Sequence, residues 1–168
     1  RGDLENVYDR FYKTMEHFKL DFAVRLNADS PLNHPLIIRK AIELLNEFPA
    51  SDIITNIFPR SYPKGMSAEI ISKNILGTNR KNVLNNSDKE NITSFFYNNY
   101  KRFRIINFSS ANSKWKDYNL SIDNINDQRI VSKLIKKFPN YHKSWINFED
   151  IISFYEKLQH QNKYKINQ

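Results

Sequence analysis

The chain has 168 residues, of which 40% are hydrophobic and 14% aromatic, enough for one folded domain with a buried core. Lys and Arg outnumber Asp and Glu by 26 to 18, and the resulting formal charge of +8 favours an anionic partner, although the charges are scattered along the sequence. The absence of cysteine excludes disulfides and thiolate metal sites, and no apolar run approaches the ~20 residues that cross a bilayer, so we expect no membrane association and a cytoplasmic location.

The predicted elements alternate between helices and strands. In chain order we expect a helix at 3–18 with Asp3 as N-cap, a strand at 21–26, a helix at 35–48 opened by Pro35, strands at 51–57 and 66–71, a short helix at 72–77 ended by Gly77, a helix at 88–100, strands at 103–109 and 118–122, and helices at 124–138 and 148–160. This order predicts a single α/β domain over 1–160, with three layers, a mostly parallel sheet and helices on both faces. A polar tail that frays is expected at 161–168.

Carboxylates follow two of the predicted strands. Asn27 and Asp29 come directly after the first strand, and Asp123 lies between the last strand and a helix. Ligands of open α/β sheets bind beyond the carboxyl ends of the strands. Two carboxylates there can share Mg²⁺, which keeps waters and completes its shell with substrate phosphates. Taken singly, each residue is better explained as a cap, Asp29 of the turn before Pro31 and Asp123 of the following helix.

Four segments in order resemble the cytidylyltransferases that make CMP-activated acidic sugars. They are residues 2–45, 52–71 ("DIITNIFPRSYPKGMSAEII"), 88–99 ("DKENITSFFYNN") and 118–135 ("YNLSIDNINDQRIVSKLI"). The family includes 3-deoxy-manno-octulosonate and N-acylneuraminate cytidylyltransferases, and the spore-coat polysaccharide branch is the most similar. In that branch the pattern I-x-A-D-C-P-L-I-D-P corresponds to residues 26–35, and V-D-T-P-E-D-L corresponds to residues 122–128.

The resemblance implies a nucleotide-diphospho-sugar transferase type of α/β fold and a nucleotidyl transfer. A sugar hydroxyl would attack the α-phosphate of CTP, pyrophosphate would leave, and a CMP-sugar for cell-surface polysaccharide would form. Asp29 and Asp123 would hold the Mg²⁺ cofactor, which neutralises charge on the phosphates. The implied partners are CTP and an acidic sugar, and a homodimer is an assembly that the resemblance allows.

The same resemblance assigns a set of substrate-binding residues. They are Asn27, Arg60, Tyr62, Lys64, Gly65, Glu69 and Glu90. Arg60 and Lys64 would meet the carboxylate of the sugar, for which the planar fork of arginine is suited. Tyr62 and Gly65 would shape the loop. Alternatively, Arg60 and Lys64 are solvated loop charges, and Glu69 and Glu90 are ordinary surface residues of a strand and a helix.

The sequence also departs from the family pattern. Ser67 stands where relatives have Asp in Gly-Leu-Asp-x-Glu, and Asn91 stands where they have His in Arg-Glu-His-Val-Thr. The nucleotide-binding loop of the type A-R-x-x-S-x-R-L-P-G-K, which follows the family's first strand, is nowhere in these 168 residues. We therefore expect the chain to correspond to the C-terminal two-thirds of such a domain and not to turn over CTP alone. The upstream part would lie outside this segment or on another chain, or the protein is a degenerate relative.

Two other classes of function stay open. The first is a catalytically inactive binding or scaffolding relative, which the Ser67 and Asn91 departures permit. The second is a nucleic-acid binder, argued from the charge and from "FFYNNYKRFRIINF" at 95–108, where cations stand among aromatics. That stretch is better explained as a helix end running into a core strand, so we expect no nucleic-acid partner. His34 and His142 have no partner at metal-ligand spacing and are expected to be packing or surface residues.

Overall fold

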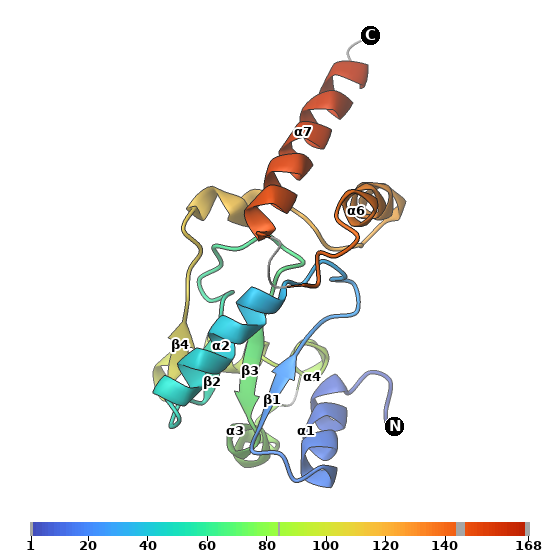
Figure 1. Cartoon of the computed structure of the whole chain (residues 1–168). Helices are drawn as coiled ribbons and strands as arrows, with labels where there is room; N and C mark the ends of the chain where they lie inside the picture. The colour runs from blue at the N-terminus through green and yellow to red at the C-terminus, as the bar shows by residue number, and fades with distance from the viewer. Residues whose placement is uncertain (1, 84, 144–146, 167–168) are drawn as a thin grey trace.

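A computed structural model describes residues 2–83, 85–143 and 147–166 (Figure 1). The elements in chain order are α1 (Val7–His17), β1 (Phe22–Arg25), α2 (Pro35–Glu47), β2 (Ile53–Thr55), β3 (Glu69–Ser72), α3 (Lys73–Asn79), α4 (Asn86–Glu90), α5 (Ser94–Asn98), the 3-10 helix η1 (Tyr100–Arg102), β4 (Ile105–Asn107), the 3-10 helix η2 (Ser113–Asp117), α6 (Ile125–Lys137) and α7 (Phe148–Ile166). No helix in the described ranges is both long and apolar enough to span a membrane.

The four strands form one mixed sheet in the order β1-β3-β2-β4. β3 pairs antiparallel with both β1 and β2, and β2 pairs parallel with β4. The prediction of a mostly parallel sheet is therefore wrong, because two of the three pairings among the described strands are antiparallel. The reason is that the connection between β2 and β3 contains no helix, so the chain reverses instead of crossing over to a parallel position.

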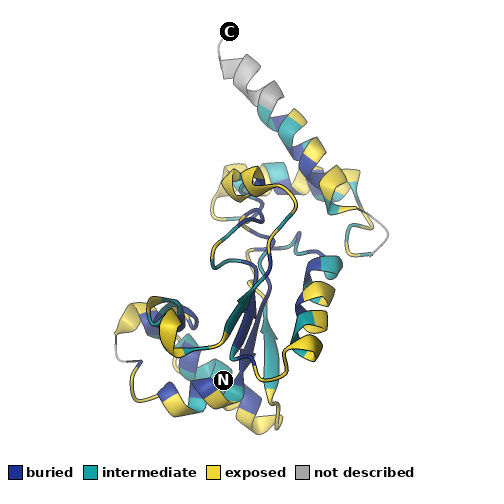
Figure 2. Ribbon diagram, turned by 90° about the vertical axis from the view of Figure 1, so that its left-hand side faces the viewer, coloured by how far each residue is buried: buried dark blue, intermediate teal, exposed yellow. Residues whose placement is uncertain are grey.

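Helices cover both faces of this sheet, which confirms the three predicted layers. Neighbouring residues of β2 and β3 alternate between two cores, as the two-residue period of a strand requires. Ile54 and Ile70 pack in the core that contains α2, α6 and α7, whereas Ile53 and Ile71 pack in the core that contains α1, α3 and α5. Figure 2 shows these buried strands between helices on both sides. The predicted α/β class is confirmed.

Two predicted helix ends are wrong. Asn6, not Asp3, caps α1, because its side chain accepts a hydrogen bond from the N–H of Asp9 at 3.0 Å. Gly77 does not end α3 but lies within it, where a Cβ atom would stand 3.2 Å from the Tyr12 ring of α1. The glycine thus allows close packing of α1 on α3 and leaves the helix to continue.

The predicted helix at 88–100 is divided into α4, α5 and η1. It breaks at Asn91, Ile92 and Thr93. These residues have poor helix propensity, because the Asn side chain competes for backbone hydrogen bonds and Ile and Thr are β-branched. The predicted strand at 118–122 is also wrong, since within the described chain it forms only an isolated parallel bridge between Lys64 and Asn119.

The predictions for α2 and α6 are confirmed to within a residue. His34 is fully buried and caps α2 by accepting the N–H of Leu36 at 3.2 Å, as expected of a packing histidine. The final helix is longer than predicted and includes most of the expected tail, because it continues to Ile166. Residues 167–168 lie outside the described chain. Figure 1 shows α7 extending away from the sheet.

Candidate active site

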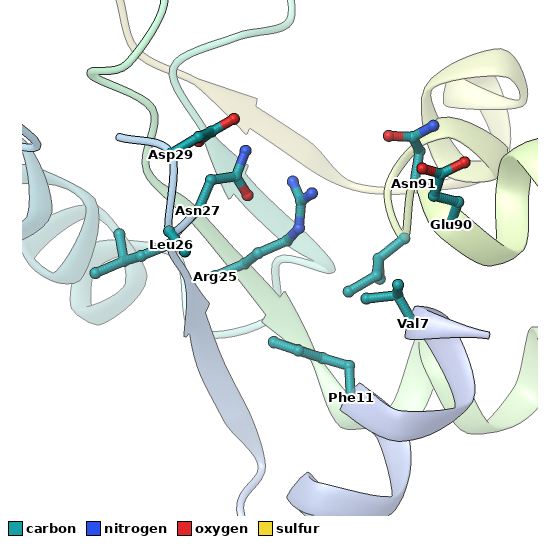
Figure 3. A pocket seen from close by; sticks show the side chains of 10 residues that line it. Val7, Phe11, Arg25, Leu26, Asn27, Asp29, Glu90 and Asn91 are labelled. Atoms are coloured by element: carbon teal, nitrogen blue, oxygen red, sulfur yellow. The ribbon is translucent and has the colours of Figure 1, made fainter. Parts of the chain in front are cut away.

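A cleft of about 460 Å³ opens at the carboxyl end of β1, between the loop that follows this strand and α4 (Figure 3). Its lining residues are Val7, Phe11, Arg25, Leu26, Asn27, Ala28, Asp29, Glu90, Asn91 and Ile92. The loop turns sharply because the N–H of Ser30 donates to the carbonyl of Asn27 at 3.1 Å. Three residues predicted from the sequence, Asn27, Asp29 and Glu90, therefore share this cleft.

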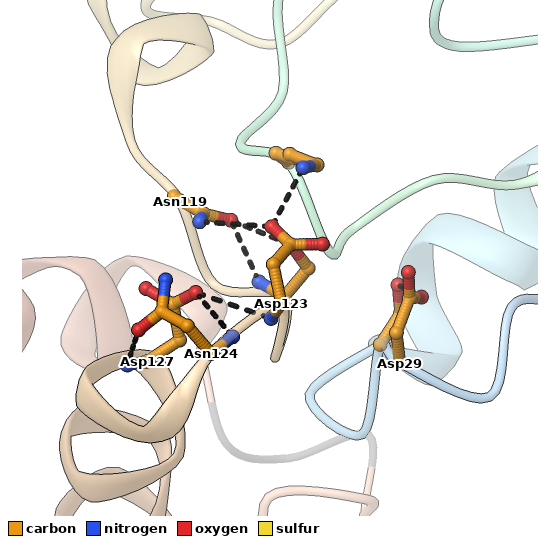
Figure 4. Close-up of polar contacts among 8 residues, drawn as sticks. Asp29, Asn119, Asp123, Asn124 and Asp127 are labelled. Carbon is orange, nitrogen blue, oxygen red and sulfur yellow. Dashed lines mark hydrogen bonds and ion pairs between the residues drawn. The ribbon is translucent and has the colours of Figure 1, made fainter.

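Two other predicted residues, Lys64 and Asp123, form a partly exposed ion pair. The Lys64 ammonium lies 2.7 Å from Asp123 Oδ2, which also accepts from Ser121 Oγ at 3.0 Å and from Asn119 Nδ2 at 3.4 Å (Figure 4). The hydrogen bond from Lys64 is the main cause that holds the pKa of Asp123 below its ordinary value, and the bond from Ser121 adds to it. Asp123 is therefore ionised and available as an anionic ligand at neutral pH.

Gly65 determines how the Lys64 loop meets the chain before Asp123. Its φ of +89° lies in the region that favours glycine, and an added Cβ would stand 2.5 Å from the carbonyl carbon of Leu120. The close approach is fixed by two backbone bonds, from Lys64 N–H to the Tyr118 carbonyl at 2.9 Å and from Leu120 N–H to the Lys64 carbonyl at 2.8 Å. These bonds place Lys64 beside Asp123.

A backbone hydrogen bond joins the Asp29 loop to the Asp123 loop. The N–H of Ile122 donates to the Asp29 carbonyl at 2.8 Å, so the two carboxylate-bearing segments are neighbours although 94 positions separate them in the sequence (Figure 4). The predicted carboxylate pair is thus brought to one place in the fold, at the edge where β1 ends.

Neither carboxylate is used as a cap, so both capping interpretations are wrong. The Asp29 carboxylate accepts from the Ser30 hydroxyl at 2.8 Å and from no backbone N–H in the described chain. The N-cap of α6 is Asn124, which forms a capping box with Asp127. Neither aspartate caps a helix or turn in the described chain, and each has one carboxylate oxygen without a donor there, so a ligand-binding role is compatible with both.

Asp29 and Asp123 each have a carboxylate oxygen of the kind that a hard divalent cation takes as a ligand. Within the described residues all three donors to Asp123 reach Oδ2, which leaves Oδ1 open, and Ser30 occupies only Oδ1 of Asp29. No group of three or more His, Cys, Asp or Glu side chains with metal-binding geometry exists in the described ranges. Such a pair suits Mg²⁺, which takes one or two carboxylates and fills its shell with water and phosphate oxygens.

Arg60 is half-buried and Tyr62 is buried. The Arg60 guanidinium donates to Ser67 Oγ at 3.1 Å and to the Pro63 carbonyl at 3.3 Å. Burial lowers the pKa of Arg60, whereas the negative charge of Glu69 acts to raise it. The interpretation of Arg60 as a solvated loop charge is therefore wrong. Tyr62 is a core residue, 5% exposed, and supports the loop from beneath.

Glu69 is a buried carboxylate in a hydrogen-bonded cluster. It is 1% exposed, and its oxygens lie 2.5 Å from Arg25 Nη1 and 2.5 Å from the Tyr97 hydroxyl. The same hydroxyl lies 3.0 Å from Thr55 Oγ1. Burial and the charge of Glu69 raise the pKa of Tyr97, which keeps the phenol neutral. The surface interpretation is wrong for Glu69, whereas Glu90 is exposed at the cleft.

The sequence analysis did not single out Arg25 or Tyr97. A signal for Arg25 existed, because Phe22, Val24 and Leu26 alternate on one face of the strand and leave Arg25 on the other. An arginine inside a strand needs a partner, and the sheet register places Arg25 opposite Glu69. Tyr97 had no comparable signal, since it reaches Glu69 only through tertiary packing.

The aromatic residues of 95–108 face inward, as predicted. Phe95 and Phe96 are buried and pack against Phe103 at ring-centroid distances of 6.3 and 5.0 Å. Tyr100 is the exception, with 51% exposure. Buried rings cannot stack on nucleic-acid bases, which removes the main argument for a nucleic-acid binder.

Comparison with known proteins supports the fold. A cytidylyltransferase from Leptospira borgpetersenii serovar Hardjo-bovis superposes with a TM-score of 0.85 at 23% identity, over 95% of this chain and 66% of that chain. The chain therefore has the same α/β fold as that structure.

Two curated proteins are similar in sequence. An uncharacterised protein of Methanocaldococcus jannaschii is 28% identical over 160 residues, which are 94% of this chain and 62% of that protein. The spore coat polysaccharide biosynthesis protein SpsF of Bacillus subtilis is 28% identical over 140 residues, which are 82% of this chain and 56% of that protein. The chain thus spans roughly three-fifths of the length of these relatives. No family model matches the sequence.

Proposed function

We propose that this chain is part of a cytidylyltransferase, an enzyme that transfers CMP from CTP to an acidic sugar for polysaccharide biosynthesis. The observation that supports the proposal is the pair Asp29 and Asp123, whose segments are joined by the Ile122–Asp29 backbone hydrogen bond and whose carboxylates cap no helix or turn in the described chain. The cytidylyltransferase fold and the similarity to a polysaccharide biosynthesis protein support it.

In this proposal the two aspartates hold Mg²⁺ at the phosphates of CTP. The ion would supply charge neutralisation at the phosphoryl oxygens and help to align the attacking and leaving groups. Asp123 Oδ1 and Asp29 Oδ2 are the oxygens that remain open for it. Lys64 holds the other oxygen of Asp123, so that this carboxylate stays oriented before the ion arrives.

The sugar would occupy the cleft beside β1. Asn27 and Glu90 offer the amide and carboxylate groups that bind sugar hydroxyls, and apolar side chains such as Phe11 line the opposite wall. Because Asp29 lines the same cleft, a sugar bound there lies next to the proposed ion. In this proposal the attacking hydroxyl would lie close to the phosphate that the ion holds.

The test is pyrophosphate release from CTP by the full-length protein with Mg²⁺ and a panel of acidic sugars. We expect release only when both CTP and one acidic sugar are present. Asp29→Asn and Asp123→Asn should each reduce the rate by about a hundredfold or more, because each removes a charge from the metal site. Asp117→Asn, an exposed aspartate on η2, is the matched control and should leave the rate unchanged.

A folded full-length protein that binds CTP and sugar but releases no pyrophosphate would contradict the proposal. That result would instead favour the binding or scaffolding relative, in which Ser67 and Asn91 replace acidic and histidine side chains of the family pattern. Release that is unaffected by both Asp→Asn substitutions would preserve the enzyme but refute the assigned metal site.

A further inference from the structure

The cleft beside β1 contains a cation that the family resemblance did not assign. Among the described residues that line the cleft, Arg25 is the only one with a positive charge. Figure 3 shows its guanidinium extending from β1 into the space between Asn27 and Asn91. Its side chain is 19% exposed, so the group is largely enclosed but open to a ligand.

Arg25 is held from beneath by a buried carboxylate. Its Nη1 lies 2.5 Å from Glu69 Oε2, and the Tyr97 hydroxyl lies 2.5 Å from the other oxygen of Glu69. Within the described chain the Arg25 side chain donates hydrogen bonds only from Nη1, so Nη2 and Nε are available as donors to a ligand. A guanidinium fixed on one edge and open on another is pre-organised to bind a planar oxyanion with two parallel hydrogen bonds.

Glu69 does not cancel the positive charge of this cluster. Arg60 also interacts electrostatically with Glu69, while its own hydrogen bonds go to neutral acceptors, Ser67 Oγ and the Pro63 carbonyl. Two arginines and one carboxylate leave this cluster with a net charge of about +1, set against the two negative charges of Asp29 and Glu90 in the cleft. An anion is therefore attracted only where it contacts the Arg25 guanidinium directly.

The two cations first expected to meet a sugar carboxylate are engaged elsewhere. Lys64 is paired with Asp123, and Arg60 donates to its own loop and does not line the cleft. Arg25 is thus the cation with donors directed to the cleft.

We propose that Arg25 binds the carboxylate of the acidic sugar, and that Glu69 and Tyr97 are its positioning residues. This inference rests on the proposed function and identifies Arg25 as the residue that recognises the sugar substrate. Asp29 and Glu90 place two negative charges in the same cleft, which disfavours a polyanion. The ligand is therefore a sugar with one carboxylate and several hydroxyls, and the phosphates of the nucleotide bind outside this cleft.

The experiment measures sugar binding without CTP or Mg²⁺, so that it is independent of catalysis. The probes are N-acetylneuraminate and 3-deoxy-manno-octulosonate, each beside its methyl ester, with pyrophosphate as the phosphate probe. The arginine Nε–Hε signals of the full-length protein are followed by NMR, and the Arg25 signal is identified from an Arg25→Lys variant. We expect this signal to shift with at least one free acid and not with its ester or with pyrophosphate.

A double variant keeps the net charge of the Arg25, Arg60 and Glu69 cluster while it removes the Arg25 guanidinium. Arg25→Gln with Glu69→Gln leaves the net charge at about +1 and avoids an unpaired buried carboxylate, which would destabilise the fold. We expect the acid to bind about tenfold or more weakly. Arg25→Lys, which retains the charge and the Glu69 partner, should bind with intermediate affinity and covers the case in which the double variant does not fold.

One single variant serves as the control. Arg129→Gln makes the same charge change as the loss of Arg25 at an exposed position on α6 and should have no effect.

Equal binding by the double variant and the wild type would overturn the inference, as would equal binding of acid and ester, a response to pyrophosphate, or no response to either acid. The proposed function fails separately. If no pyrophosphate is released from CTP while the Arg25 signal still responds to the acid, the cleft binds acidic sugars but the transfer is refuted.

Discussion

Gly65→Ala tests whether the Lys64 loop and the Asp123 segment form one rigid unit. The added methyl would stand 2.5 to 2.7 Å from backbone atoms of Leu120 and Ser121, which cannot rotate away as a side chain would. The left-handed backbone at φ +89° costs a non-glycine residue about 1–2 kcal/mol, and forcing a methyl into a packed contact costs about 1–3 kcal/mol. We expect the free energy of unfolding to fall by about 2–5 kcal/mol.

The assay is urea denaturation of wild type and variant, followed by far-UV circular dichroism. Gly77→Ala is the matched control, because its methyl would meet only the Tyr12 side chain at 3.2 Å and alanine has the better helix propensity. This control should change the free energy of unfolding by less than about 1 kcal/mol. If Gly65→Ala also changes it by less than about 0.5 kcal/mol, the loop is adaptable and the reasoning is refuted.

Three further substitutions probe the neighbourhood of the site. Asn124→Ala removes the N-cap of α6 and should lower the free energy of unfolding by about 1 kcal/mol in urea denaturation; no change would refute the cap. Lys64→Met removes the cation beside Asp123, so the pKa of Asp123 in carboxyl NMR should rise toward its ordinary value; an unchanged pKa would contradict the ion pair. Tyr97→Phe deprives buried Glu69 of one donor and should cost about 1–3 kcal/mol in thermal or urea unfolding, a loss that a surface carboxylate would not show.

The sequence predicts elements better than it predicts their pairing. The apolar spacing of α2 and α6 depends on local periodicity, so the bounds of these helices are correct to within a residue. The direction of β3 follows from a connection to β2 that the predicted element order already left without a helix, and the expectation of a mostly parallel sheet overlooked this. The segment 118–122 has strand-like composition but forms only one bridge to Lys64, because strand pairing depends on tertiary contact.

The sequence singled out Asp29 and Asp123 as carboxylates that follow predicted strands, and it could not report on residues that meet by tertiary contact. Only Asp29 follows an observed strand, and a backbone bond from Ile122 joins the two aspartate segments. The roles of Glu69 and Lys64 could not be deduced, because their partners Arg25 and Asp123 lie 44 and 59 positions away in the sequence. Charged side chains satisfied by such distant partners look solvent-exposed when only the sequence is considered.

The most direct test of the cytidylyl-transfer account is the rate of CMP-sugar formation by the full-length protein as a function of Mg²⁺ concentration, in the wild type and in Asp29→Asn and Asp123→Asn. The account predicts that formation requires Mg²⁺, CTP and an acidic sugar. It also predicts that both variants need more Mg²⁺ for half-maximal rate and form product about a hundredfold more slowly or worse. Product formation at the wild-type rate and Mg²⁺ requirement in both variants, or no CMP-sugar from any acidic acceptor, would contradict it.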